Sequence, residues 1–368
     1  MTEKSSAIES PLLGMHTAAG AVIGEFFGTR LPARFGEFSD EYRAARESVA
    51  LVDASYFCAF SFTGPDRARY LNAVLTSNVR DLPPGSGAIG LLLTPQGHIL
   101  AEVQTYALAD RILAVSHFMA RERTLATLEK FIIMDDVTLE DVTDKTAALA
   151  LTGPRTAAVI AELAGLDLGA MPAWSHAEAA LGGIPCRAIG HSNSANWMGQ
   201  PGATLLVATE TLPDAWAFLE REVRSRGGSA AGYEAINSIR LESGVAWFGA
   251  DFDGQQIPHE AGLEHSHISY EKGCYTGQEI VERVRSRGHV NRRLAGLAFA
   301  LPDPPRAGAS LLLNGAEVGQ VTSAAFSPRL GRPIGLGYLR REHSAPGTTL
   351  GCAGGTAEVI SPLGARPA

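Results

Sequence analysis

Lysine is nearly absent from this sequence. Of its 368 residues only four are lysine, at positions 4, 130, 145 and 272, so arginine supplies almost all the positive charge, and the net charge is -8. A chain with this excess of acidic groups lacks the general positive field that drives nucleic-acid binding, although a local basic face remains open. Lys272 is therefore one of few amines in the molecule.

Cysteine and long apolar runs are also scarce. The four cysteines are widely separated and form no CxxC pair, which argues against a zinc site or a disulfide framework. No stretch approaches the ~18 apolar residues of a membrane span, and the first residues lack a basic segment leading into an apolar run. We expect a cytoplasmic protein in a reducing compartment, without a membrane partner.

No metal site is predicted either. Asp251-Phe252-Asp253 with His259 and Glu260 is the most acidic candidate, but its spacing matches no ligand motif.

What the sequence does contain is a repeated α+β pattern. A buried strand, a Thr-Gly-Pro turn and an alanine-containing helix occur at residues 56–75 and again after residue 147. Strands at 88–94 and 98–106 flank Pro95-Gln96-Gly97 and predict a hairpin, and a strand at 111–116 leads into a helix around 121–130. Two similar α+β units are implied.

The ends of the chain have a different texture. Residues 1–15 are polar and weakly patterned, so we expect order to begin near Gly20. Helices are predicted at 212–226 and 233–241, after a polar loop at 191–203. Past residue 290, short apolar strands punctuated by glycine and proline predict a small antiparallel barrel. The predicted fold class is α+β with a separate C-terminal barrel.

The densest cluster of reactive residue types is the segment 272–279, Lys-Gly-Cys-Tyr-Thr-Gly-Gln-Glu. Helical spacing of the apolar residues that follow predicts a helix that begins near Gly277 and ends at Gly288. Cys274 then precedes a helix N-terminus, where the helix dipole and the Lys272 ammonium favour a thiolate. The alternative is a buried cysteine that packs beside an aromatic ring.

Almost the whole chain resembles the glycine-cleavage T-protein superfamily. The segments that look like its two parts are Ser48-Val49-Ala50-Leu51-Val52-Asp53, Thr63-Gly64-Pro65-Asp66, Leu75-Thr76-Ser77-Asn78-Val79, Leu151-Thr152-Gly153-Pro154, Arg240-Leu241-Glu242-Ser243-Gly244, and, in the barrel, Gly319-Gln320-Val321-Thr322-Ser323 and Gly335-Leu336-Gly337-Tyr338. The resemblance implies a three-module cloverleaf around an opening that holds tetrahydrofolate. Two interleaved α+β modules would occupy 18–288, the inserted one about 55–142, and the barrel 289–366.

Within that superfamily, segment 272–279 resembles the signature of YgfZ-type folate-binding proteins, which are tied to iron–sulfur cluster assembly or repair and to tRNA modification. Aminomethyltransferases usually lack this cysteine. The resemblance therefore implies a tetrahydrofolate-binding accessory protein with a functional Cys274 and iron–sulfur proteins as clients. The alternatives are a tetrahydrofolate-dependent aminomethyltransferase or demethylating methyltransferase, or a non-catalytic scaffold, so enzymatic activity is left open.

Two departures from the aminomethyltransferase pattern bear on that choice. Those enzymes carry Gly-Gly-x-x-Asp-Asp after the first hairpin turn, and alignment on Tyr106 places Ala101 and Glu102 at the acidic positions. Glu102 is then either a catalytic carboxylate with one extra methylene or a simple sheet-edge carboxylate. The glutamate expected to hold the pterin's amino nitrogen falls within 190–204 and is replaced by Thr204.

We assign catalytic roles to Cys274, Lys272 and Glu102. Tetrahydrofolate, or a one-carbon derivative of it, is expected to contact Tyr106, Arg240, Phe248, Tyr275, Gln278 and Arg283.

Alternatives remain for several of these residues. Arg240 and Glu242 can form an internal ion pair, and Phe248 can serve interdomain packing with Trp247. The basic run at 283–287, continued at 292–293, is either a solvated helix end or a site for the folate polyglutamate tail or an RNA phosphate. His265, His267 or His289 could assist the Cys274 thiol.

Overall fold

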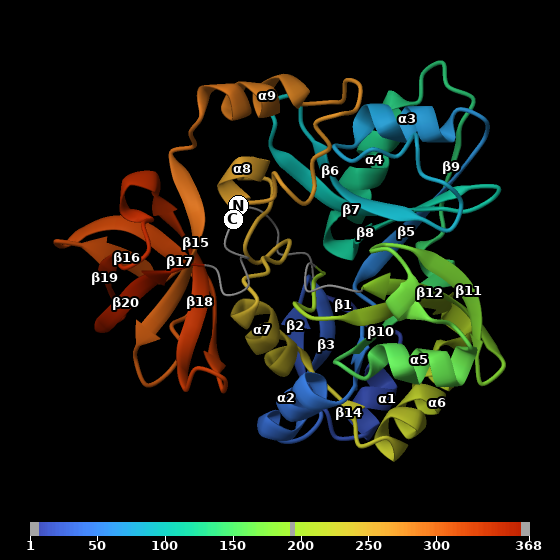
Figure 1. The fold of residues 1–368 in the computed structure, drawn as a ribbon, viewed down its shortest axis with the longest axis horizontal. Helices are drawn as coiled ribbons and strands as arrows, with labels where there is room; N and C mark the ends of the chain where they lie inside the picture. The colour runs from blue at the N-terminus through green and yellow to red at the C-terminus, as the bar shows by residue number, and fades with distance from the viewer. Residues whose placement is uncertain (1–6, 192–195, 362–368) are drawn as a thin grey trace.

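The computed structural model describes residues 7–191 and 196–361, and it consists of three modules around a common centre (Figure 1). The first module is built on an antiparallel β-sheet and the second on a sheet with one parallel pair, β14 with β4, and helices pack on both. The third module is a closed six-stranded barrel. The predicted α+β class with a C-terminal barrel is confirmed. None of the helices in the described ranges is long and apolar enough to cross a membrane.

The first module is a five-stranded sheet, in the order β6-β7-β8-β5-β9, with two helices packed against it. Its elements are β5 (Phe57–Thr63), α3 (Arg67–Val74), β6 (Gly87–Leu93), β7 (Ile99–Ala107), β8 (Ile112–His117), α4 (Arg121–Phe131) and β9 (Thr138–Asp141). The predicted hairpin is confirmed, since β6 and β7 pair antiparallel from Gly87 with Tyr106 to Leu93 with Ile99. This hairpin carries Glu102 towards the centre of the molecule.

The second module is a six-stranded sheet, in the order β11-β12-β13-β10-β4-β14. Its strands and main helices are α2 (Phe38–Glu47), β4 (Ala50–Asp53), β10 (Thr146–Thr152), α5 (Thr156–Ala164), β11 (His176–Leu181), β12 (Ile184–His191), β13 (Gly202–Ala208), α6 (Leu212–Ser225), β14 (Ser229–Ala230) and α7 (Tyr233–Glu242). The two predicted helices are confirmed. The loop predicted at 191–203 is too long, because β13 already begins at Gly202. Residues 192–195 of that loop lie outside the described part of the chain.

The N-terminal prediction is wrong, because structure begins well before Gly20. The first elements are β1 (Ile8–Glu9), α1 (Leu13–Ala18), β2 (Val22–Phe26) and β3 (Thr29–Arg34). Ser10 Oγ and His16 Nε2 lie 2.6 and 3.0 Å from the buried Asp53 carboxylate on β4. These long-range contacts, invisible to local patterning, fix the segment onto the second module.

The barrel closes through antiparallel pairing of its first and last strands. Its strands are β15 (Arg292–Ala300), β16 (Ser310–Leu313), β17 (Ala316–Ser327), β18 (Arg332–Arg340), β19 (Thr349–Cys352) and β20 (Gly355–Ile360). Strands β17 and β18 approach so closely that a Cβ on Gly319 would lie 2.2 Å from the Tyr338 carbonyl oxygen. A side chain there would push the two strands apart.

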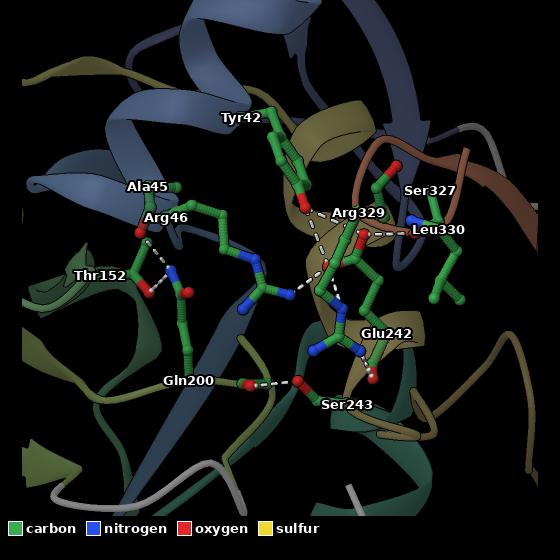
Figure 2. A network of polar contacts seen from close by, with 12 residues as sticks. Tyr42, Ala45, Arg46, Thr152, Gln200, Glu242, Ser243, Ser327, Arg329 and Leu330 are labelled. Atoms are coloured by element: carbon green, nitrogen blue, oxygen red, sulfur yellow. Dashed lines mark hydrogen bonds and ion pairs between the residues drawn. The ribbon is translucent and has the colours of Figure 1, made fainter. Parts of the chain in front are cut away.

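Two buried carboxylates, each paired with an arginine, join α7 and the connection that follows it to the barrel by hydrogen bonds from barrel hydroxyls. The Glu242 carboxylate, at the end of α7, pairs with Arg46 on α2 and accepts a hydrogen bond of 2.6 Å from Ser327 Oγ on the barrel, as Figure 2 shows. Asp251 pairs with Arg240 and accepts hydrogen bonds from two barrel hydroxyls, Thr322 and Ser323. Arg240 and Glu242 therefore form internal ion pairs, but with other partners than each other.

Two short helices complete the connection to the barrel. They are α8 (Pro258–Ala261) and α9 (Gln278–Arg287), and α9 is flanked by Gly277 and Gly288, both in the left-handed region, with φ of 82° and 87°. The predicted bounds of this helix are confirmed. Figure 1 shows α8 near the centre of the cloverleaf and α9 bridging the first module and the barrel.

Candidate functional site

A cavity of about 540 Å³ lies where the three modules meet, and we call it the central cavity. The first module contributes Glu102 and His117, the second contributes Trp197, and the barrel contributes Leu294 and Leu336. Its volume is in the range of about 300–1,000 Å³ that is usual for cofactor and small-molecule sites.

Aromatic rings form much of the cavity wall. They are Trp174, Trp197, Trp247 and Phe248. The Trp247 indole N–H donates to the Trp197 carbonyl oxygen at 2.7 Å, which fixes the two segments to each other. The Trp197 indole N–H is buried and has no partner among the described residues. The cavity thus offers flat apolar faces, which suit an aromatic ligand.

Glu102 is the charged group of this wall, and two histidines hold it. His117 Nε2 on β8 lies 3.1 Å from Glu102 Oε2, and His267 Nε2 lies 2.9 Å from Glu102 Oε1. Burial acts to raise the pKa of the Glu102 carboxyl, but hydrogen bonds and charge from His117 and His267 outweigh burial and lower it to about 2. Glu102 is therefore ionised at neutral pH.

The hydrogen-bond chain continues from Glu102 to the cavity surface. Ser266 Oγ lies 2.7 Å from His267 Nδ1, and Ser266 is exposed on the cavity wall whereas His267 is buried. Sequence reasoning missed Ser266 and His117, and it considered His267 only as a helper for Cys274. Their separation along the chain from Glu102 gave no local signal, because β-strand pairing and a distant loop bring them together.

Tyr106, Phe248 and Arg240 occupy three different environments. Phe248 lies on the cavity wall. Tyr106 is fully buried, and its hydroxyl donates at 2.7 Å to the amide oxygen of Gln104, which does line the cavity. Arg240 is buried against Asp251 and over the Trp247 ring, 4.4 Å from the centroid, on the far side of that wall. Only Phe248 is placed to touch a ligand directly.

Thr204 lies on β13, behind the same wall. Its hydroxyl is 2.9 Å from Nε2 of the buried His191, and burial lowers the pKa of His191 to about 4. The ring of His191 meets the cavity residue Trp174 edge-on at 5.2 Å. A neutral hydroxyl–imidazole pair thus supports the wall at the position where a glutamate was expected.

The signature segment 272–279 lies apart from the central cavity. Among the described residues, Lys272, Cys274, Tyr275, Gln278 and Arg283 are not part of its lining. Instead the segment packs on the turn of the β6–β7 hairpin: a Cβ on Gly277 would lie 2.6 Å from the Thr94 carbonyl oxygen. The structure therefore does not bring this segment together with Glu102.

Within the segment, Cys274 is exposed, whereas Cys58, Cys186 and Cys352 are buried. The alternative prediction, a buried Cys274 that packs beside an aromatic ring, is thus wrong. Tyr275 is buried, with a hydroxyl that has no partner in the described part of the chain. Arg283 is exposed and pairs with Glu279, four residues earlier.

Lys272 is held by backbone carbonyls rather than by the cysteine. Its ammonium donates to the carbonyl oxygens of Asn72 and Leu75, at the end of α3, and to that of Ser77 at 3.0 Å. Burial lowers the pKa of this amine to about 8, and Arg80 adds to the effect. The contacts describe a lysine that joins α3 to the signature segment.

No group of three or more histidine, cysteine or acidic side chains within the described ranges is arranged to hold a metal ion. The basic run is dispersed: Arg285 lies over the Tyr270 ring, at 4.2 Å from its centroid, and Arg292 pairs with Glu260. The side chain of Arg287 lies outside the described residues.

Comparison with known families accounts for this architecture. Residues 12–269 match the model of the GCVT N-terminal domain, and residues 292–358 match that of the glycine cleavage T-protein C-terminal barrel domain. The chain belongs to the glycine cleavage T-protein family. Tetrahydrofolate is the cofactor of this family.

Individual T-protein relatives cover nearly the whole chain. The aminomethyltransferase of Streptomyces coelicolor is 30% identical, over 90% of this chain and 89% of its own, and that of Rubrobacter xylanophilus is 29% identical, over 90% and 87%. The crystal structure of the glycine cleavage system aminomethyltransferase T from Bartonella henselae superposes with a TM-score of 0.86 at 25% identity, covering 97% of this chain and 98% of that one. These names favour the transferase interpretation over the YgfZ interpretation.

Proposed function

We propose that this T-protein family member is a tetrahydrofolate-dependent one-carbon transferase that acts on an aminomethyl or N-methyl donor in the central cavity. The observation that carries the proposal is the ionised Glu102 carboxylate, held by His117 and His267 in the wall of an aromatic-lined cavity. Bound tetrahydrofolate would supply the nitrogen that accepts the one-carbon unit.

The residues present suit that cofactor. Trp174, Trp247 and Phe248 provide flat surfaces for a ring, and the Gln104 amide can pair with donors and acceptors on its edge. The three rings and the amide of this cavity therefore match a pterin.

The role of Glu102 follows from its pKa. A carboxyl with a pKa of about 2 is a weak base at neutral pH, because general bases act best when their pKa lies near the working pH. Its negative charge is instead suited to accept an N–H of the ligand and to stabilise positive charge that develops during transfer. Glu102 is thus proposed as a fixed anion.

The test is turnover by the pure protein with tetrahydrofolate and either an aminomethyl-lipoyl protein or an N-methyl amine. The product to detect is methylene-tetrahydrofolate from the first donor and methyl-tetrahydrofolate from the second. Glu102→Gln should lower kcat roughly 10²–10³-fold, the usual loss when one preorganised electrostatic group is removed. Glu129→Gln, on an exposed face of α4, is the matched control. Tetrahydrofolate binding without turnover of any donor would contradict the proposal.

A second candidate function is the YgfZ-type accessory role in iron–sulfur protein maintenance. The exposure of Cys274, in contrast to the other three cysteines, favours it. The two proposals separate in cells that lack the native gene. Loss of rescue by Cys274→Ala but not by Glu102→Gln supports the accessory role, and the reverse pattern supports the transferase.

A further inference from the structure

We infer that Ser266 and His267 form the acid–base site of the central cavity, with Ser266 carrying protons between a bound ligand and the His267 imidazole. This inference rests on the proposed one-carbon transfer. It assigns the proton movement that Glu102 is too acidic to perform.

The hydrogen-bond chain fixes the tautomer of His267. An ionised carboxylate only accepts hydrogen bonds, so the 2.9 Å contact with Glu102 Oε1 requires a proton on His267 Nε2. In the neutral ring Nδ1 then carries no proton and is a base. Ser266 Oγ lies 2.7 Å from that atom and 3.5 Å from the Leu263 carbonyl oxygen, so beside the neutral ring its hydroxyl donates over the shorter distance, to His267 Nδ1.

The two residues differ in accessibility in the way that a relay requires. His267 is 7% exposed and Ser266 is exposed on the cavity lining, so a ligand reaches the hydroxyl before the ring. Glu102 on β7 is the charged group in contact with His267. His117 on β8 lies across the same carboxylate, and His265 on the same loop also lines the cavity.

The chemistry balances with this pair alone. Each N–C bond formed on tetrahydrofolate replaces one N–H bond and breaks one bond from the carbon to its donor, so each exchange releases one proton and its leaving amine or thiol takes one up. Methyl transfer needs one such exchange, and formation of the methylene bridge needs two, which release the thiol and the amine in turn. The released proton passes to Ser266 Oγ as the serine proton passes to His267 Nδ1. The imidazolium, paired with Glu102, returns a proton through Ser266 to the leaving group.

Turnover across a range of pH tests the inference. His267→Gln keeps a donor for Glu102 but has no basic nitrogen, so kcat should fall roughly 10²–10⁴-fold and the decline of kcat on the acid side should disappear. The kcat of Ser266→Ala should also fall, and Ser266→Thr, which restores the hydroxyl, should recover most of the wild-type kcat. His289→Gln, an exposed histidine outside this cavity, is the control.

Tetrahydrofolate affinity, measured in parallel, should stay within about threefold of wild type in each variant, because the pair moves protons rather than binding the ring. Wild-type kcat and pH profile in His267→Gln would overturn the inference and leave the proposed function standing. Nitrogen NMR of the histidine side chains gives an answer without turnover. A proton on Nδ1 rather than Nε2 of His267 at neutral pH would overturn it as well.

Discussion

At the scale of single residues, Glu102 shows how neighbours decide what a side chain can do. The carboxylate is surrounded by protein on β7, and burial alone would favour its neutral form. Two imidazole N–H groups reverse this preference. The interpretation of Glu102 as a simple sheet-edge carboxylate is wrong. Its strand β7 lies between β6 and β8, and the residue lines the central cavity.

The depressed pKa of Glu102 predicts how its contribution to stability depends on pH. The carboxyl titrates near 4.5 when unfolded and near 2 when folded, so its stabilisation is complete above about 4.5 and is lost as pH falls towards 2. The free energy of unfolding of the wild type should exceed that of Glu102→Gln by roughly 1–3 kcal/mol at pH 6–8, and this difference should narrow below pH 4.5. Urea unfolding of both proteins at several pH values measures the difference. A constant gap from pH 7 to 3 would contradict this assignment.

At the scale of elements, segment 272–279 joins parts of the first module. Its helix α9 starts at Gly277 against the hairpin turn, where a Cβ on Gly97 would meet Ile280 at 2.9 Å. Lys272 reaches across to the last carbonyls of α3, which an α-helix leaves without partners. The segment thus has a structural role that its reactive composition did not suggest.

Loss of the Lys272 ammonium should destabilise this junction. Lys272→Met keeps much of the side-chain volume but leaves three buried carbonyl acceptors short of a donor, so the free energy of unfolding should fall by about 1–3 kcal/mol. Lys145→Met is the control, because Lys145 is exposed and its ion pair with Glu140 lies on the surface. Chemical denaturation measures both variants. Equal stability of the two would refute the role assigned to Lys272.

At the scale of the whole molecule, the central cavity exists only because the three modules hold their relative positions. Two carboxylates, Glu242 and Asp251, each pair with an arginine and accept hydrogen bonds from barrel hydroxyls (Figure 2 shows the first). Buried charges of this kind are costly when they lack partners, so the contacts of each carboxylate favour one arrangement of the barrel relative to α7.

Removing the barrel hydroxyls should loosen that arrangement. Ser323→Ala and Ser327→Ala together should lower stability by roughly 2–4 kcal/mol, because each leaves a buried carboxylate oxygen with one donor fewer. Amide hydrogen exchange should rise in β17 and in the connection after α7. Ser310→Ala, whose hydroxyl bonds Glu317 at the surface, should do neither. Unchanged amide hydrogen exchange in the double variant would show that these two hydrogen bonds do not hold the barrel against α7.

The sequence by itself determined many of the elements and their kinds, but not those before Gly20. Alternation of apolar and polar residues and Thr-Gly-Pro turns are local signals. Neighbouring residues alone therefore predicted the β6–β7 hairpin, the helices after residue 210, helix α9 and the short strands of the barrel. Motif resemblance added the cloverleaf and the cofactor.

Only the tertiary structure decided which of these residues meet. Glu102 and His267 are far apart in the chain, and the same holds for Asp53 with Ser10 and for Lys272 with Asn72. Such contacts arise from strand pairing and module packing, which place side chains by three-dimensional position rather than by spacing along the chain. The predicted site was therefore centred on Cys274, where the chemistry is dense in sequence, while the cavity formed around Glu102, where distant segments converge.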